Sequence, residues 1–122
     1  MNIVKIMGHY SVDITGKIEL YVSRMRIMNV TETKASYTWT RTRISKSEMG
    51  KINSRSPDLH SMYFNTFVLD EVDAVANATK EMEEKMRSVL GRLIVSTELS
   101  IIHAKKALIE KCEVKDEVYE PY

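Results

Sequence analysis

Several residue types that often point to a location or a fold are scarce in this chain of 122 residues. The single cysteine, Cys112, excludes an internal disulfide and fits a reducing compartment. Every apolar run is shorter than the roughly 18 residues that indicate a transmembrane helix. The apolar stretch at the N-terminus is too short for a signal peptide, and Lys5 interrupts it. We therefore expect a cytoplasmic protein with no membrane partner.

The sequence motifs of common enzymes are also missing. The segment around Gly50 and Lys51 is not a phosphate loop, because it lacks the upstream glycine and the hydroxyl residue that would ligate magnesium. His9, His60 and His103 are far apart, and no histidines or cysteines have the spacing of metal ligands. We expect a protein that is not an enzyme and that uses no metal or other cofactor.

Charge is distributed unevenly along the chain, although the formal net charge is only +1. Residues 24–55 carry eight basic and two acidic side chains, whereas residues 56–122 carry eight basic and thirteen acidic ones. If the two halves form separate layers, the basic layer can attract a phosphate-bearing small molecule, a nucleic acid or an acidic protein. Alternatively, the two halves attract each other within one domain or between subunits. Because the whole chain is nearly neutral, nucleic acid is the less favoured partner.

The first half of the chain has the residue pattern of β-strands. Strands are expected over residues 3–12, 17–28, 36–44 and 62–68, with a turn that contains Gly16 and a long polar loop over residues 46–60. The apolar side of the second strand changes near Ser23, which predicts a β-bulge there. In the third strand, Trp39, Arg41 and Arg43 share one side because successive side chains alternate.

The second half has the pattern of an amphipathic helix that Asp70 is expected to cap. Gly91 is a stop signal, yet the apolar spacing continues past it. The sequence therefore permits two helices with a break at Gly91, or one helix over about residues 70–112. A single helix would span roughly 60 Å, whereas a globule of this size has a radius of gyration of about 14 Å. Such a helix would overhang its domain and expose an apolar stripe, so we expect a homodimer or a larger assembly.

These patterns predict one α+β domain that covers residues 1–122. An antiparallel β-sheet layer over residues 1–68 is followed by a helical layer over residues 69–112, which is either one long helix or a helical hairpin. An acidic tail over residues 113–122 ends the chain.

Two groups of residues are candidates for ligand binding. Trp39 beside Arg41 and Arg43 suits a nucleotide, because the ring can stack on a base while guanidinium groups bind phosphate. The alternative is that Trp39 lies at the edge of the core and the arginines extend into solvent. In the second group, Phe67 can stack on a base and the amide of Asn77 can bind an adenine edge or a ribose hydroxyl. The alternative there is a core phenylalanine and an exposed asparagine.

The layout resembles that of the phage-encoded Thoeris anti-defence sponge proteins. Phe67 and Asn77 are ten positions apart, Arg41 or Arg43 precedes them on a predicted strand, and Arg92 follows on the predicted helix. The resemblance covers most of the chain through layout and residue types, without a contiguous motif. It implies a cytoplasmic phage protein with an N-terminal antiparallel sheet and C-terminal helices, assembled as dimers or larger oligomers. It also implies pockets between subunits that sequester a cyclic ADP-ribose signal without cleaving it.

Two other functions remain open from the residues alone. A small phage or bacterial inhibitor or adaptor could bind a host protein through the acidic helical half or the basic sheet. A nucleic-acid binder could use the basic patch, and its binding would then depend strongly on salt.

Overall fold

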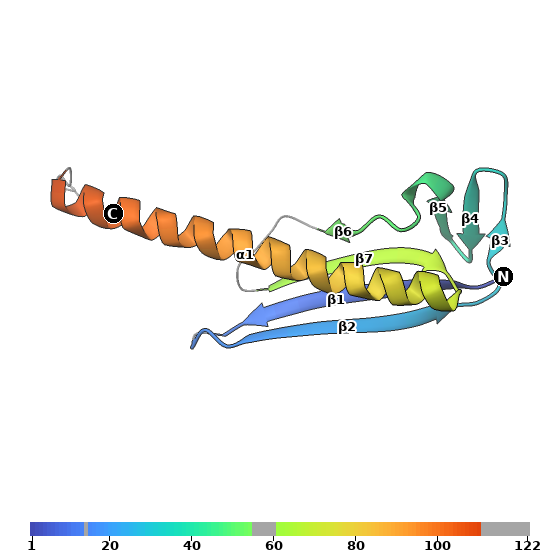
Figure 1. The fold of residues 1–122 in the computed structure, drawn as a ribbon. Coiled ribbons are helices and arrows are strands. Elements are labelled where there is room, and N and C mark those ends of the chain that lie inside the picture. The colour runs from blue at the N-terminus through green and yellow to red at the C-terminus, as the bar shows by residue number, and fades with distance from the viewer. Residues whose placement is uncertain (14, 55–60, 111–122) are drawn as a thin grey trace, which may run out of the picture.

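The computed structural model describes residues 1–13, 15–54 and 61–110, and these form two antiparallel sheets and one long helix (Figure 1). The elements are strands β1 (Ile3–Val12), β2 (Ile18–Ile27), β3 (Thr31–Glu32), β4 (Ser36–Trp39) and β5 (Thr42–Ser45), the 3-10 helix η1 (Lys46–Glu48), strands β6 (Asn53–Ser54) and β7 (Ser61–Leu69), and helix α1 (Val72–Glu110). The predicted α+β fold, an N-terminal antiparallel sheet followed by a long C-terminal helix, is confirmed. Cys112, His60 and the predicted acidic tail lie outside the described residues.

The main sheet has the strand order β2-β1-β7-β6, and all its pairs are antiparallel. Strand β1 pairs with β2 without interruption, from Ile3 opposite Ile27 to Val12 opposite Ile18. The β-bulge predicted near Ser23 is therefore wrong. Because β2 is an edge strand, polar side chains such as Arg24 can reach solvent on the same face as the core residues, so the regular register is kept.

The single strand predicted over residues 36–44 is also wrong. The chain reverses there, and β4 and β5 form a hairpin in which Trp39 lies opposite Thr42. Thr40 takes the positive φ of 48° that the tight turn requires. Arg41 consequently lies in the turn, and Arg43 lies on the opposite face of the hairpin from Trp39, because Thr38 is its partner in the register. Together with β3, this hairpin forms a small second sheet.

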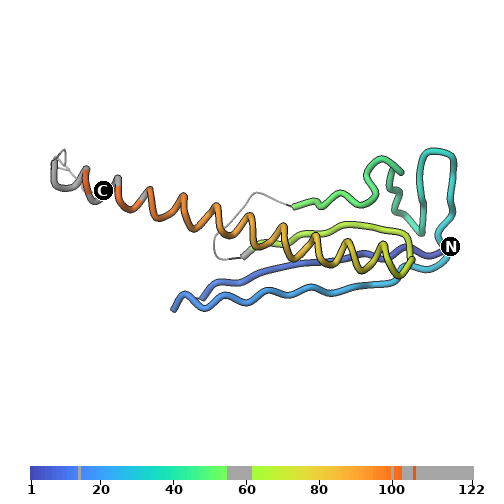
Figure 2. The backbone as a smooth tube through the Cα atoms, viewed as in Figure 1, coloured from blue at the N-terminus to red at the C-terminus, as the bar shows by residue number. Residues whose placement is uncertain are grey.

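Helix α1 is continuous from Val72 to Glu110, so the one-helix alternative is correct and Gly91 lies inside the helix. At 1.5 Å per residue its 39 residues span about 58 Å. The ten-residue strands of the main sheet span only about 33 Å. The last part of α1 therefore projects beyond the sheet, as the ribbon and the backbone tube both show (Figures 1 and 2).

Asp70 does not cap the helix, contrary to the prediction. The first carbonyl to accept a helical hydrogen bond is that of Glu71, which receives the N–H of Val75 at 2.9 Å. The carboxylate of Asp70 instead forms an ion pair with Arg26 on β2, in which Oδ2 lies 2.8 Å from Nε. This ion pair joins the start of α1 to the edge strand of the main sheet.

Two hydrophobic cores lie on opposite faces of the main sheet. The larger core packs α1 on the sheet and includes Val4, Ile6, Tyr10, Met62, Phe64, Val68, Ala78, Met82, Met86, Val89 and Leu90. The smaller core packs the small sheet against one end of the other face, around Ile3, Val30 and Tyr37. Among residues 1–13, 15–54 and 61–110, no helix covers the rest of that second face. Within the described ranges, no helix is both long enough and apolar enough to cross a bilayer.

Candidate binding face of the sheet

Three aromatic side chains from neighbouring strands stack on the face of the main sheet that points away from α1. His9 on β1 lies directly opposite Tyr21 on β2 and Tyr63 on β7 in the strand register. Its ring centroid is 4.5 Å from that of Tyr21 with an interplanar angle of 15°, and 5.4 Å from that of Tyr63 with an angle of 27°. Both tyrosines are exposed, and Tyr63 keeps 69% of its surface accessible. We call these three residues the aromatic ladder.

An acidic residue fixes the outer end of the aromatic ladder. The hydroxyl of Tyr21 donates a hydrogen bond to Oε2 of Glu19, two residues earlier on the same strand. This bond raises the pKa of Tyr21 and lowers the pKa of Glu19. Lys17, whose Nζ is 3.1 Å from Oε1 of Glu19, lowers the pKa of that carboxyl further. The Tyr21 ring is thereby held upright beside His9.

A second aromatic group lies further along the same face, where the small sheet meets the main sheet. Trp39 of β4 contacts Phe67 of β7, with ring centroids 5.5 Å apart and an interplanar angle of 49°. The ammonium group of Lys5 lies 5.8 Å from the Phe67 centroid, within the range of a cation–π contact. Lys5 also lies opposite the exposed Met25 on β2. This group therefore combines two rings with one cation.

Polar and apolar side chains separate the two aromatic groups. The row between them contains Met7 with Ser23 and Asn65 on either side, and Asn53 of β6 lies opposite Asn65. At about 3.3 Å per residue, the Phe67 row and the Tyr63 row are about 13 Å apart along β7. The exposed rings of Tyr21 and Tyr63 offer surfaces on which a planar ligand can stack, whereas Trp39 and Phe67 are partly buried against the smaller core. The amide of Asn65 between the two groups can donate and accept hydrogen bonds.

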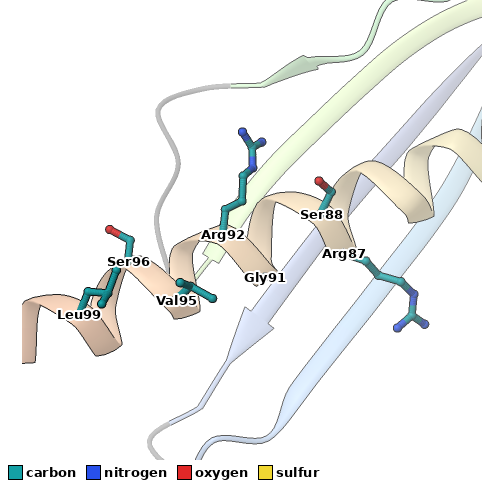
Figure 3. Close-up of a pocket in the computed structure, with 7 residues that line it drawn as sticks. All are labelled: Arg87, Ser88, Gly91, Arg92, Val95, Ser96 and Leu99. Carbon is teal, nitrogen blue, oxygen red and sulfur yellow. The ribbon is translucent and has the colours of Figure 1, made fainter. Parts of the chain in front are cut away.

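The structure brings together only some of the residues that the sequence singled out. Trp39 and Phe67, which belonged to different predicted groups, are in direct contact. Asn77 is exposed on α1, on the other side of the main sheet from Phe67, so one chain does not bring this pair together. Arg92 is also exposed on α1, where it lines a hollow of the helix surface (Figure 3).

The two arginines of the small sheet are not aimed at the Trp39 ring as predicted. Arg41 is exposed in the β4–β5 turn. Nε of Arg43 donates a hydrogen bond of 3.1 Å to Oγ of Ser36, on the face of the hairpin opposite Trp39. The alternation of side chains along one strand does not continue through a hairpin turn. A spacing of two residues therefore does not place Arg41 and Arg43 beside Trp39.

The aromatic ladder was not among the predicted sites. His9 and Tyr21 are each six residues from Thr15, the centre of the β1–β2 register, whereas the predicted strand ends at residues 12 and 17 would have paired His9 with Leu20. Tyr63 joins them through the pairing of β1 with β7, which links residues more than fifty positions apart. No local signal in the sequence carries that information.

Other features of the described residues offer less chemistry. A hollow of about 270 Å³ lies between the small sheet and the start of α1, with Tyr37 and Lys46 in its wall. Nζ of Lys46 already contacts Oε1 of Glu32 at 2.7 Å, and this contact raises the pKa of Lys46. The charge of the lysine is therefore compensated within the chain. Across the described ranges, no three histidine, cysteine or carboxylate residues gather in a way that could hold a metal ion.

Comparison with known proteins adds no relative to this picture. No family model, no curated protein and no solved structure matches the chain.

Proposed function

We propose that this chain is a binding protein, not an enzyme, and that it holds a nucleotide-type ligand on the sheet face that carries the aromatic ladder. The observation that carries the proposal is the exposure of stacked rings there, with the Trp39–Phe67 pair and Lys5 on the same face. Stacking of a base on an aromatic side chain is worth about 1–3 kcal/mol. A cation beside the rings suits the phosphate of such a ligand.

A cyclic ADP-ribose signal is the ligand that we propose within this class. Such a molecule combines an adenine ring with a pyrophosphate, and the face offers rings, the Lys5 ammonium group and the Asn65 amide within one ligand length. Retention of the signal without cleavage would make the chain a phage anti-defence sponge that acts in the host cytoplasm. This site uses Trp39 and Phe67 from the sequence-based candidates and does not use Arg41, Arg43, Asn77 or Arg92.

Calorimetry with a panel of nucleotides tests the proposal. The panel contains the cyclic ADP-ribose isomers, linear ADP-ribose, AMP and adenosine, and any bound ligand is recovered intact after the protein is denatured. We expect Tyr63→Ala and Lys5→Gln each to weaken binding about tenfold. Asn77→Ala is the matched control, because it removes an exposed amide on the other side of the sheet. Absence of heat with every nucleotide overturns the proposal, and loss of binding in Asn77→Ala alone moves the site to the helix.

A protein-binding inhibitor or adaptor is the second candidate, and the edge strand β2 favours it. This strand has ten residues, contains no proline or bulge, and pairs with β1 alone among the described strands. An exposed regular edge can accept an extended segment of another protein as a further strand. A stoichiometric host partner whose capture is unaffected by nucleotide would favour this function over the first.

A further inference from the structure

The face of α1 that points away from the sheet changes character along the helix. With 3.6 residues per turn, Asp73, Asn77 and Glu84 lie on this outward face, opposite the buried Met82 and Met86. This first part is polar, as expected for a solvated helix face.

Further along, the same face becomes small and apolar. It continues through Ser88, Gly91, Val95, Leu99 and Ile102, all of them exposed. Val95, Leu99 and Ile102 keep 56%, 52% and 58% of their surface accessible. Apolar residues on the outward side of the helix do not pack against their own chain. An exposed apolar stripe of this kind is typical of a surface that binds another molecule.

A hollow marks the centre of this stripe (Figure 3). It is shallow and open to solvent, and the residues that line it all belong to α1: Arg87, Ser88, Gly91, Arg92, Val95, Ser96 and Leu99. A Cβ atom on Gly91 would have no neighbour within 4 Å, so no contact in the described chain requires a glycine there. Glycine is unfavourable inside a helix. A second helix that packs closely against α1 would explain why a glycine occupies this position, whereas the contacts of the single chain do not.

We propose that this stripe is the interface of a homodimer in which two α1 helices pair antiparallel, with Val95 of both copies at the two-fold axis. Residues equidistant from Val95 then come to the same level on opposite helices. Gly91 meets the level of Leu99, so each Leu99 enters the hollow of the other copy. Ser88 likewise meets the level of Ile102. On both sides of the Val95 pair, small residues thus face large ones, which allows the ridges of one helix to fit into the grooves of the other.

Charge complementarity favours a second copy of the chain in this same orientation. Glu84 and Lys106 are exposed and equidistant from Val95 along the helix. The antiparallel pairing brings Glu84 of each copy to Lys106 of the other, twice in the dimer. A parallel pairing would instead place like charges together and leave the two hollows facing each other. A self-complementary patch of this kind is what a two-fold interface requires.

The sheets do not obstruct this arrangement. Each main sheet packs on the inward side of its own α1, and the antiparallel crossing sends the two sheets to opposite ends of the dimer. The faces with the aromatic ladders remain open in both copies. The dimer is therefore independent of the proposed ligand, and failure of one proposal leaves the other intact.

Sedimentation velocity of the full-length chain over a range of micromolar concentrations tests the interface. We expect a dimer that Val95→Glu converts to a monomer. Val72→Glu is the matched control, since Val72 is an 88% exposed valine at the start of the same helix and outside the stripe. It should leave the dimer unchanged. A monomeric wild type, or equal effects of the two glutamates, overturns the proposal.

A charge exchange tests the antiparallel orientation. Glu84→Lys and Lys106→Glu should each weaken dimerisation about tenfold, and the chain that carries both changes should recover the wild-type dissociation constant. Circular dichroism confirms that each variant is folded. Additive weakening in the double variant contradicts the pairing, because a chain that is merely destabilised by charge changes gains nothing from their combination.

Discussion

Gly8 of β1 lies directly beneath Met82 of α1. A Cβ atom at position 8 would fall 2.8 Å from Cγ of Met82 and 2.9 Å from its Sδ, closer than such contacts occur in folded proteins. Met82 is fully buried in the core between helix and sheet. The absence of a side chain at Gly8 therefore sets how closely the helix approaches the sheet, and it allows the methionine to fill the space above β1.

Substitution of Gly8 by alanine should destabilise the protein. The added methyl group must displace Met82, and also Met86, whose Sδ would lie 3.0 Å from it. Overpacking of a tight core costs about 1–3 kcal/mol. Urea denaturation measures the change in the free energy of unfolding. Ser11→Ala, on the exposed part of the same strand, is the control and should change it by less than about 0.5 kcal/mol. Equal values for the two variants would show that the helix is not in close contact at Gly8.

Thr66→Val should stabilise the fold. Thr66 is 1% exposed on the helix-facing side of β7, and among the described residues its Oγ1 has no hydrogen-bond partner. A buried hydroxyl without a partner carries a desolvation penalty of about 1–3 kcal/mol, and valine has nearly the same shape without it. We expect a gain of about 1 kcal/mol in the free energy of unfolding, with the exposed Thr42→Val as control. A loss of stability would mean that a buried water satisfies this hydroxyl.

The three long strands of the main sheet and the helical character of the second half could be predicted from the sequence because their signals are local. Gly16 adopts the positive φ of 86° that the predicted turn requires, and β1, β2 and β7 lie within a residue or two of their predicted ranges. Continuity through Gly91 could not be decided locally. The glycine favours a stop, whereas Leu93 and Ile94 pack against the core just beyond it. Those tertiary contacts hold the helix together past the glycine.

Only part of the proposed binding face could be predicted from the sequence. Trp39 and Phe67 were each predicted as ligand-binding residues because of their aromatic rings. Their contact depends on the β4–β5 hairpin, which was not predicted. Residues 39–42 contain no glycine, asparagine or proline, so no typical turn residue indicated the turn at Thr40. The place of Asn77 depends on which face of the sheet the helix covers, and a helical pattern does not specify that face.

The contact of Trp39 with Phe67 makes the only tryptophan of the chain a reporter of this face. Phe67→Ala should expose the indole to water and shift its fluorescence emission to longer wavelength. Because Phe67 is only partly buried, the loss of stability should be about 1–2 kcal/mol, below the usual cost for a fully buried phenylalanine. Tyr63→Ala is the control, because the Tyr63 ring stacks on His9 and not on Trp39 within the described residues, so this change should leave the emission unchanged. An unchanged spectrum in Phe67→Ala would refute the contact.

The bond between Tyr21 and Glu19 should be visible in the pH dependence of the protein. It raises the pKa of Tyr21 above the ordinary 10.0 and lowers that of Glu19 below the ordinary 4.5. Its contribution to stability is therefore present between these ordinary values. It is lost as the pH rises through the raised pKa of Tyr21 or falls through the lowered pKa of Glu19.

Glu19→Gln removes the charge that holds Tyr21 protonated, so the pKa of this tyrosine should return toward its ordinary value. The ultraviolet absorbance of tyrosinate during an alkaline titration measures the change, and comparison with Tyr21→Phe assigns it among the six tyrosines. Lys17→Gln is the control, because Lys17 acts on the pKa of Glu19 and is not among the causes of the Tyr21 shift. If Glu19→Gln and wild type titrate alike, the tyrosine hydroxyl is not bonded to this carboxylate, and the ring at the end of the aromatic ladder is free to turn away from His9.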